Sequence, residues 1–181
     1  MTNVIKSFFD DHSQLTSVLA GEANLSLRLA VDRHFQKILV VATASYCEDL
    51  VKGIILDFAS RSSGHNNGIV SLIKSKAAER QYHTLFDWAQ NSSIGVNKFW
   101  SLFGDGQKKK VKEALKLDPS AVVKADAFIQ VGQLRNLLVH GNFGAMNIDL
   151  TIEEIRSKSE LALSYISFIR AQLVPDEPAD T

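Results

Sequence analysis

The segment Leu134-Arg135-Asn136-Leu137-Leu138-Val139-His140-Gly141 holds the side chains best suited to chemistry in this chain. On a continuous helix Asn136 and His140 are four positions apart and share one face, and Arg135 flanks that face, about 100° round the axis. Gly141 is a residue type that ends helices, which places His140 in the last turn, where the negative end of the helix dipole attracts positive charge. We therefore expect three polar groups together at the end of one helix.

These three side chains suit cleavage of a phosphodiester. An imidazole that titrates near neutrality can take a proton from a 2′-hydroxyl or give one to the leaving oxygen, so His140 is the candidate acid and base. The guanidinium of Arg135 can hold a phosphate and stabilise charge that develops on its oxygens. The amide of Asn136 can orient the imidazole or the phosphate. The apolar residues between them are expected to anchor the helix to the core: Leu134, Leu137 and Leu138.

The elements that position these groups are predicted to be helices throughout, because few prolines interrupt the chain and no alternating strand pattern occurs. The first helix follows Asn3, carries a stripe of Ile5, Phe8, Leu15 and Leu19, and closes at Gly21. The other core helices are a second of about 35 residues from near Ser26 to the Ser62–Gly68 loop, a third from Pro119 to His140 with Asp118 as its cap, and a fourth from the capping box Thr151/Glu154 to Leu173. The fold class is all-α, a bundle of four core helices.

The residues from about 65 to 117 are predicted to form a helical insertion between the core helices. Short amphipathic pieces are separated there by Gly, Ser and Asn clusters: Ile69–Ala78, Tyr82–Gln90, Asn97–Phe103 and Gln107–Leu117. Residues 1–173 are thus expected to form a single domain, and the acidic, proline-bearing segment 174–181 is expected to be a disordered tail.

Composition limits the classes of function. The 181 residues include 20 basic and 20 acidic side chains, so the net charge is zero and the chain lacks the overall positive field of a duplex-coating protein. A nucleic-acid site would have to be local. One cysteine, Cys47, excludes an internal disulfide and fits a reducing compartment. No apolar run long enough for a membrane span and no secretory signal pattern occur, so we expect a cytoplasmic protein.

The hexapeptide Arg135-Asn136-Leu137-Leu138-Val139-His140 resembles the R-x(4-6)-H motif of the HEPN superfamily in its Arg-Asn-x-x-x-His form. The start Arg33-His34-Phe35 and the later Ala44-Ser45-Tyr46-Cys47-Glu48-Asp49-Leu50 resemble the long helix of HEPN proteins of the RiboL-PSP type. The resemblance covers the core helices, roughly 4–60 and 119–173, and leaves the insertion unexplained.

The resemblance implies a metal-independent endoribonuclease with no cofactor, in which Arg135 and His140 are catalytic and Asn136 supports them. In the superfamily two motifs meet across a two-fold interface, so it also implies a homodimer joined across the Arg135–His140 face. Many such proteins act in toxin–antitoxin or anti-phage systems, which implies a restraining antitoxin or regulatory partner. The chain departs from many relatives after the motif. In those relatives an aromatic residue follows the His, as in His-x-Tyr, whereas here Gly141-Asn142-Phe143 follows His140. The implied chemistry is therefore hydrolysis and not the tyrosine-linked modification of some relatives.

Three alternatives remain open from the sequence. The motif residues can be a surface Arg and a helix-ending His without a role. The domain can keep the motif and only bind RNA or a protein. It can also be an antitoxin or scaffold subunit whose role is to form an interface with another subunit.

Other residues admit both a functional and a structural interpretation. Glu48, on the long apolar helix, can orient Arg135 as a supporting residue or lie half-exposed at the helix surface. The run Lys108-Lys109-Lys110 can guide RNA, although a solvated helix face is the commoner origin of such runs. Cys47 has no evident base beside it and is not expected to be a nucleophile. Gly104-Asp105-Gly106 is interpreted as a turn.

The remaining histidines and the large aromatic residues give weaker signals. No spacing suited to a metal site joins His12, His34, His65 and His83, and His12 is expected to be a satisfied core residue. The aromatic residues that could stack bases are more often part of a core at this spacing: Trp88, Trp100 and Phe103.

Overall fold

The computed structural model describes residues 3–63, 67–79, 82–89 and 93–175, and these contain helices and no β-strand. The prediction of an all-α fold is confirmed. In chain order the elements are α1 (Asn3–Val18), η1 (Glu22–Asn24), α2 (Leu25–Ser63), α3 (Gly68–Ile73), η2 (Lys74–Ala78), α4 (Tyr82–Leu85), α5 (Ser93–Ser101), α6 (Gly104–Leu117), α7 (Pro119–His140) and α8 (Ile152–Leu173).

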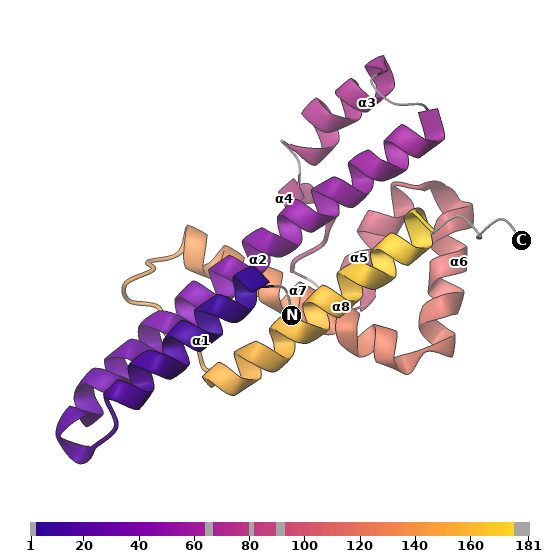
Figure 1. Ribbon diagram of the computed structural model, residues 1–181. Coiled ribbons are helices and arrows are strands. Elements are labelled where there is room, and N and C mark those ends of the chain that lie inside the picture. The colour runs from indigo at the N-terminus through magenta and orange to yellow at the C-terminus, as the bar shows by residue number, and fades with distance from the viewer. Residues whose placement is uncertain (1–2, 64–66, 80–81, 90–92, 176–181) are drawn as a thin grey trace, which may run out of the picture.

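Helix α2 is the axis of the molecule (Figure 1). It runs unbroken through Gly53 for 39 residues, which is about 58 Å at the rise of an α-helix. Helices α1, α7 and α8 pack against it. The long second helix is therefore confirmed, and it begins at Leu25, one residue before the expected Ser26.

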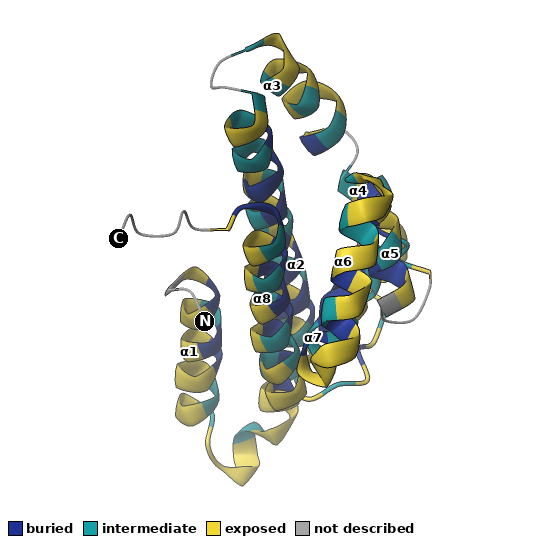
Figure 2. Ribbon diagram, turned by 90° about the vertical axis from the view of Figure 1, so that its right-hand side faces the viewer, coloured by how far each residue is buried: buried dark blue, intermediate teal, exposed yellow. Residues whose placement is uncertain are grey.

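Two hydrophobic clusters lie at the two halves of α2 (Figure 2). The smaller cluster joins α1, the first half of α2, the end of α7 and the start of α8, and includes Phe9, Leu39, Leu138 and Ile155. The larger cluster joins the second half of α2 to α5, α6, α7 and α8, and includes Val51, Trp100, Phe128, Tyr165 and Ile169. Helix α7 contributes buried side chains to both clusters, so both of its ends are packed against other helices.

The buried face of α1 differs from the predicted stripe. Ile5, Phe9 and His12 are buried, whereas Phe8 is only partly buried and Leu15 is exposed. The prediction is correct for Ile5 and wrong for Leu15, because the buried positions of α1 are 5, 9 and 12 and position 15 lies outside that face. His12 is satisfied as predicted, with its Nε2 atom 2.7 Å from Asp32 Oδ1.

The starts of α7 and α8 follow the predicted capping patterns. The Asp118 carboxylate accepts from the Ser120 N–H at 2.9 Å, ahead of Pro119 in the first turn. Thr151 Oγ1 accepts from the Glu154 N–H at 3.1 Å, and Glu154 Oε2 accepts from the Thr151 N–H at 2.7 Å, which completes the capping box. The predicted apolar positions of α8 are all buried: Ile152, Ile155, Ala162, Ile166, Ile169 and Leu173.

Between α2 and α7 the chain forms short helices, but their bounds differ from those predicted. Helix α4 ends at Leu85, because the chain turns at Asp87, whose N–H donates to the Gly95 carbonyl at 3.0 Å. A side chain at Gly95 would lie 2.7 Å from the Asp87 carbonyl oxygen, so this close approach requires glycine. The turn expected at residues 104–106 was wrong, since Gly104, with φ +87°, opens α6.

The C-terminal end of the described chain is packed. Val174 is buried, and the Pro175 carbonyl accepts from Arg61 Nη1 at 3.3 Å. The rest of the predicted tail, residues 176–181, lies outside the described residues, as do His65 and Gln90. No described helix is both long and apolar enough to span a membrane.

Candidate functional site

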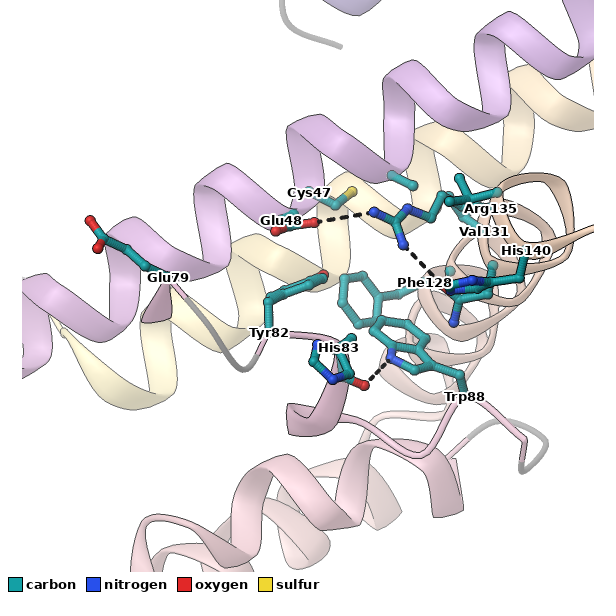
Figure 3. A pocket seen from close by; sticks show the side chains of 14 residues that line it. Cys47, Glu48, Glu79, Tyr82, His83, Trp88, Phe128, Val131, Arg135 and His140 are labelled. Atoms are coloured by element: carbon teal, nitrogen blue, oxygen red, sulfur yellow. Dashed lines mark hydrogen bonds and ion pairs between the residues drawn. The ribbon is translucent and has the colours of Figure 1, made fainter. Parts of the chain in front are cut away.

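A cleft of about 450 Å³ opens beside the C-terminal half of α7 (Figure 3). Its floor comes from α2 and α7, and one wall comes from the chain between η2 and α5. Its lining residues are Ala44, Cys47, Glu48, Glu79, Tyr82, His83, Trp88, Phe128, Val131, Gly132, Arg135, Asn136, Val139 and His140. The structure thus brings all four residues singled out from the sequence to one cavity: Glu48, Arg135, Asn136 and His140.

The three motif side chains lie on the last turns of α7. Arg135 Nη1 donates to Asn136 Oδ1 at 3.1 Å, and both residues are half-buried, while His140 is exposed. Of the leucines expected to anchor this segment, Leu138 is buried, but Leu137 is 55% exposed. That part of the prediction was wrong because position 137 points away from the core and into a surface hollow that it shares with Trp88 and Met146.

The backbone around Gly141 defines the end of α7. Its N–H donates to the Leu137 carbonyl at 2.9 Å, and a Cβ there would lie 2.7 Å from that carbonyl oxygen, so glycine fits the close approach. Buried Lys37 of α2 holds the following loop, because its Nζ donates to the Phe143 carbonyl at 2.7 Å. His140 therefore sits on a helix end that is tied to α2.

Glu48 and Cys47 form the α2 side of the floor. The Glu48 carboxylate is 2.5 Å from Lys52 Nζ and 3.9 Å from Arg135 Nη2, so Lys52 is its closer partner and Arg135 is at the long limit of an ion pair. Burial raises the pKa of the Cys47 thiol to about 12, so that the thiol stays protonated at neutral pH. This agrees with the expectation that Cys47 is not a nucleophile.

The wall contains functional candidates that the sequence did not connect with the motif. Tyr82 and Trp88 are half-buried and His83 is exposed, and all three face the motif across the cleft (Figure 3). Burial, followed by the nearby Cys47 and Glu48, raises the pKa of the Tyr82 hydroxyl, and Arg135 opposes this shift. The phenol is therefore neutral and able to donate a hydrogen bond.

A second hollow, of about 640 Å³, adjoins the cleft on the far side of Trp88 and His140. Trp88, Asn136 and His140 line both cavities, and the second is otherwise bounded largely by apolar groups, among them Leu137 and Met146. Asn136 and His140 therefore lie between the cleft, which also contains the charged side chains of Glu48 and Arg135, and a more apolar hollow.

The other candidates lie apart from the cleft. Lys108-Lys109-Lys110 is on α6, His34 is exposed on α2, and none of these residues lines the cavity. Trp100 is buried in the core, as expected for an aromatic residue at helical spacing. Within the described ranges, no three His, Cys, Asp or Glu side chains are grouped to hold a metal ion.

Comparison with known families decides the identity of the fold. A sequence model of the RiboL-PSP-HEPN family matches residues 5–174. The chain belongs to the RiboL-PSP-HEPN family. The resemblance drawn from the motif is thereby confirmed. The match also spans residues 65–117, which that resemblance left unexplained. No curated protein and no solved structure matches the chain.

Ribonucleases and RNA-binding modules are both common in the HEPN superfamily, to which this RiboL-PSP-HEPN protein belongs. The cleft contains groups that serve either class. A guanidinium can hold a phosphate in both cases, whereas an exposed imidazole beside it is needed only for cleavage.

Proposed function

We propose that this RiboL-PSP-HEPN protein is a metal-independent endoribonuclease. The observation that carries the proposal is the convergence of Arg135, Asn136 and His140 at one open cleft, with Glu48 across its floor. A phosphate ligand and a proton-transfer group are the minimum that phosphodiester cleavage requires.

In the proposed reaction the 2′-oxygen of the RNA attacks the adjacent phosphorus. A bond forms between the 2′-oxygen and phosphorus, the bond from phosphorus to the 5′-oxygen breaks, and a 2′,3′-cyclic phosphate results, which water can then open. An imidazole of His140 takes the 2′-hydroxyl proton or gives a proton to the leaving 5′-oxygen. Arg135 stabilises the charge on the non-bridging oxygens, and Asn136, bonded to that guanidinium, orients it.

One His140 cannot act as both base and acid in the same step, and a symmetric pair of clefts would supply two. We therefore propose a homodimer joined across the Arg135–His140 face. The exposed apolar side chains beside His140 support it, since Leu137 is 55% and Val139 51% exposed. Leu137 borders the second hollow and Val139 the cleft, so apolar side chains are exposed on both sides of His140, as an interface over this end of α7 requires.

The dimer is tested by Leu137→Arg, which places a charge in the proposed contact. We expect this variant to sediment as a monomer and to lose RNA cleavage, while its helical circular dichroism stays unchanged. Arg135 and His140 remain in place in this variant. A dimer of unchanged stability would show that the interface lies elsewhere.

The ribonuclease is tested by incubating mixed single-stranded RNA with the protein in EDTA. Wild type is expected to cut, and His140→Ala is expected to lose activity by a factor of about 100 to 10,000. The matched control is His34→Ala, which removes an exposed histidine of α2 outside the cleft and should cut normally. Equal cutting by all three proteins would point to a contaminating nuclease.

The alternative is a non-catalytic module that binds RNA or a protein through the same cleft. It predicts retention of intact RNA, and motif variants that change affinity alone. A toxin or defence nuclease needs restraint, so we also propose an antitoxin or regulatory partner. Such a partner should bind wild type and suppress cleavage in the same EDTA assay.

A further inference from the structure

The wall of the cleft differs in chemistry from its floor. Tyr82, His83 and Trp88 come from the segment between η2 and α5, and they face Arg135 and His140 across the opening (Figure 3). The proposed phosphodiester cleavage assigns no part to them. Two aromatic rings that line the proposed phosphate site nevertheless need an explanation.

Trp88 packs against α7 at Gly132, where the helix has no side chain. A Cβ built at Gly132 would lie 2.1 Å from Trp88 Cζ3 and 2.4 Å from Cε3, so the indole occupies the space where any other residue would have a side chain. Its Nε1 donates to the His83 carbonyl at 3.0 Å. Its ring packs against Phe86 and Phe128, with centroids 5.0 Å and 5.7 Å away. The indole is therefore fixed in orientation before any ligand arrives.

Although it is fixed, Trp88 is not buried. It is half-exposed and lines both the cleft and the adjoining apolar hollow. Trp100 shows the contrast: it is 1% exposed, and its Nε1 donates to the Tyr165 hydroxyl at 3.1 Å inside the core. The Tyr82 ring lies 6.0 Å from the Trp88 ring and extends the aromatic surface toward Glu48.

We infer that Trp88 and Tyr82 form a binding surface for one unpaired nucleobase next to the phosphate held by Arg135, so that the substrate is single-stranded RNA. This inference rests on the proposed ribonuclease function. Aromatic faces bind bases of any sequence by stacking, provided that the base is not paired within a helix. The cleft, at about 450 Å³, is in the size range of sites for one small ligand and is too small for a duplex.

The test uses the intrinsic fluorescence of the full chain, which contains two tryptophans. In the Trp100→Phe variant Trp88 is the sole indole, and a base stacked on it should quench its emission. The probe is a single-stranded oligoribonucleotide with 2′-O-methyl groups, which cannot be cut by the proposed route. We expect saturable quenching with this probe and none with its duplex form at the same concentrations.

Two further variants connect the signal with affinity. Trp88→Leu removes the ring and is expected to weaken binding of the probe roughly tenfold, whereas Trp88→Phe keeps a ring and should weaken it less. Gly132→Ala should resemble Trp88→Leu, because its methyl group displaces the indole. If Gly132→Ala fails to fold, the quenching and the Trp88→Phe result still decide the matter.

The two proposals can fail separately. Unchanged affinity in Trp88→Leu, absence of quenching in Trp100→Phe or equal quenching by the duplex overturns the base-binding surface, even if RNA cleavage in EDTA is normal. Binding that depends on Trp88 without any cleavage supports the base-binding surface and overturns the ribonuclease.

Discussion

The floor and the wall of the cleft show two different ways in which a fold assembles a site. The floor residues Arg135, Asn136 and His140 lie within two turns of one helix that is packed at both ends. The wall residues Tyr82 and Trp88 come from a short helix and a turn. Trp88 is positioned by Gly132, by the His83 carbonyl and by neighbouring aromatic rings, and Tyr82 packs against Phe86 and Trp88. Local periodicity builds the first arrangement and tertiary packing builds the second.

This difference predicts a division of roles, in which the floor residues carry out the chemical step and the wall residues bind the substrate. Floor variants should lower kcat, and wall variants should raise KM with little change in kcat.

After His140→Ala, Arg135→Ala should have the largest effect. Loss of the phosphate ligand is expected to lower kcat about 100- to 1,000-fold, and Arg135→Lys should recover only part of it because an ammonium lacks the planar fork. Single-turnover cleavage at saturating RNA measures this. Arg33→Ala, an exposed arginine of α2 outside the cleft, is the control. A rise in KM with an unchanged kcat would show that Arg135 acts in substrate binding and not in the chemical step.

Glu48→Gln should have a smaller effect. The carboxylate is 3.9 Å from Arg135 Nη2 and closer to Lys52, so we propose that it orients the guanidinium weakly. Removing its charge is expected to lower kcat by roughly three- to tenfold. The double variant Glu48→Gln/Arg135→Ala should then be no slower than Arg135→Ala alone, and additive losses would show that Glu48 acts independently.

His83→Ala tests the division directly, because it removes the second imidazole of the cleft. If proton transfer belongs to His140, kcat should change by less than about threefold, with the larger change in KM. The pH–rate profile should keep its shape. A loss as large as that of His140→Ala would place a second proton-transfer group on the wall and end the distinction between the two surfaces.

Asp118→Ala should have the smallest effect, and on stability alone. Hydrogen bonds from Ser120 lower the pKa of this carboxyl, so the contribution of its charge to stability is present above the unfolded-state pKa and is lost as pH falls through the lower folded-state value. We expect a melting temperature a few degrees below that of wild type at pH 7, a gap that narrows under acid conditions, and an unchanged kcat. A change in kcat would show that the start of α7 influences its catalytic end.

The sequence predicted the floor better than the wall for physical reasons. Asn136 and His140 are related by helical periodicity, and the caps Asp118 and Thr151 are recognised from their neighbours alone. Nothing local relates Trp88 to Gly132, because their contact depends on how the segment after α4 folds back onto α7. The exposure of Leu137 was missed for the same reason, since only the arrangement of the neighbouring elements places its side chain in a surface hollow.

In the proposed reaction His140 promotes attack by a 2′-hydroxyl at this cleft. The most direct measurement uses DNA oligonucleotides that each carry one ribonucleotide, one oligonucleotide for each base, incubated with the protein in EDTA. Wild type should cut at least one of them immediately 3′ of the ribonucleotide and leave a 2′,3′-cyclic phosphate or its hydrolysed form, and His140→Ala should leave all of them intact. Cutting at deoxyribonucleotides, or cutting by His140→Ala at the wild-type rate, would contradict the account.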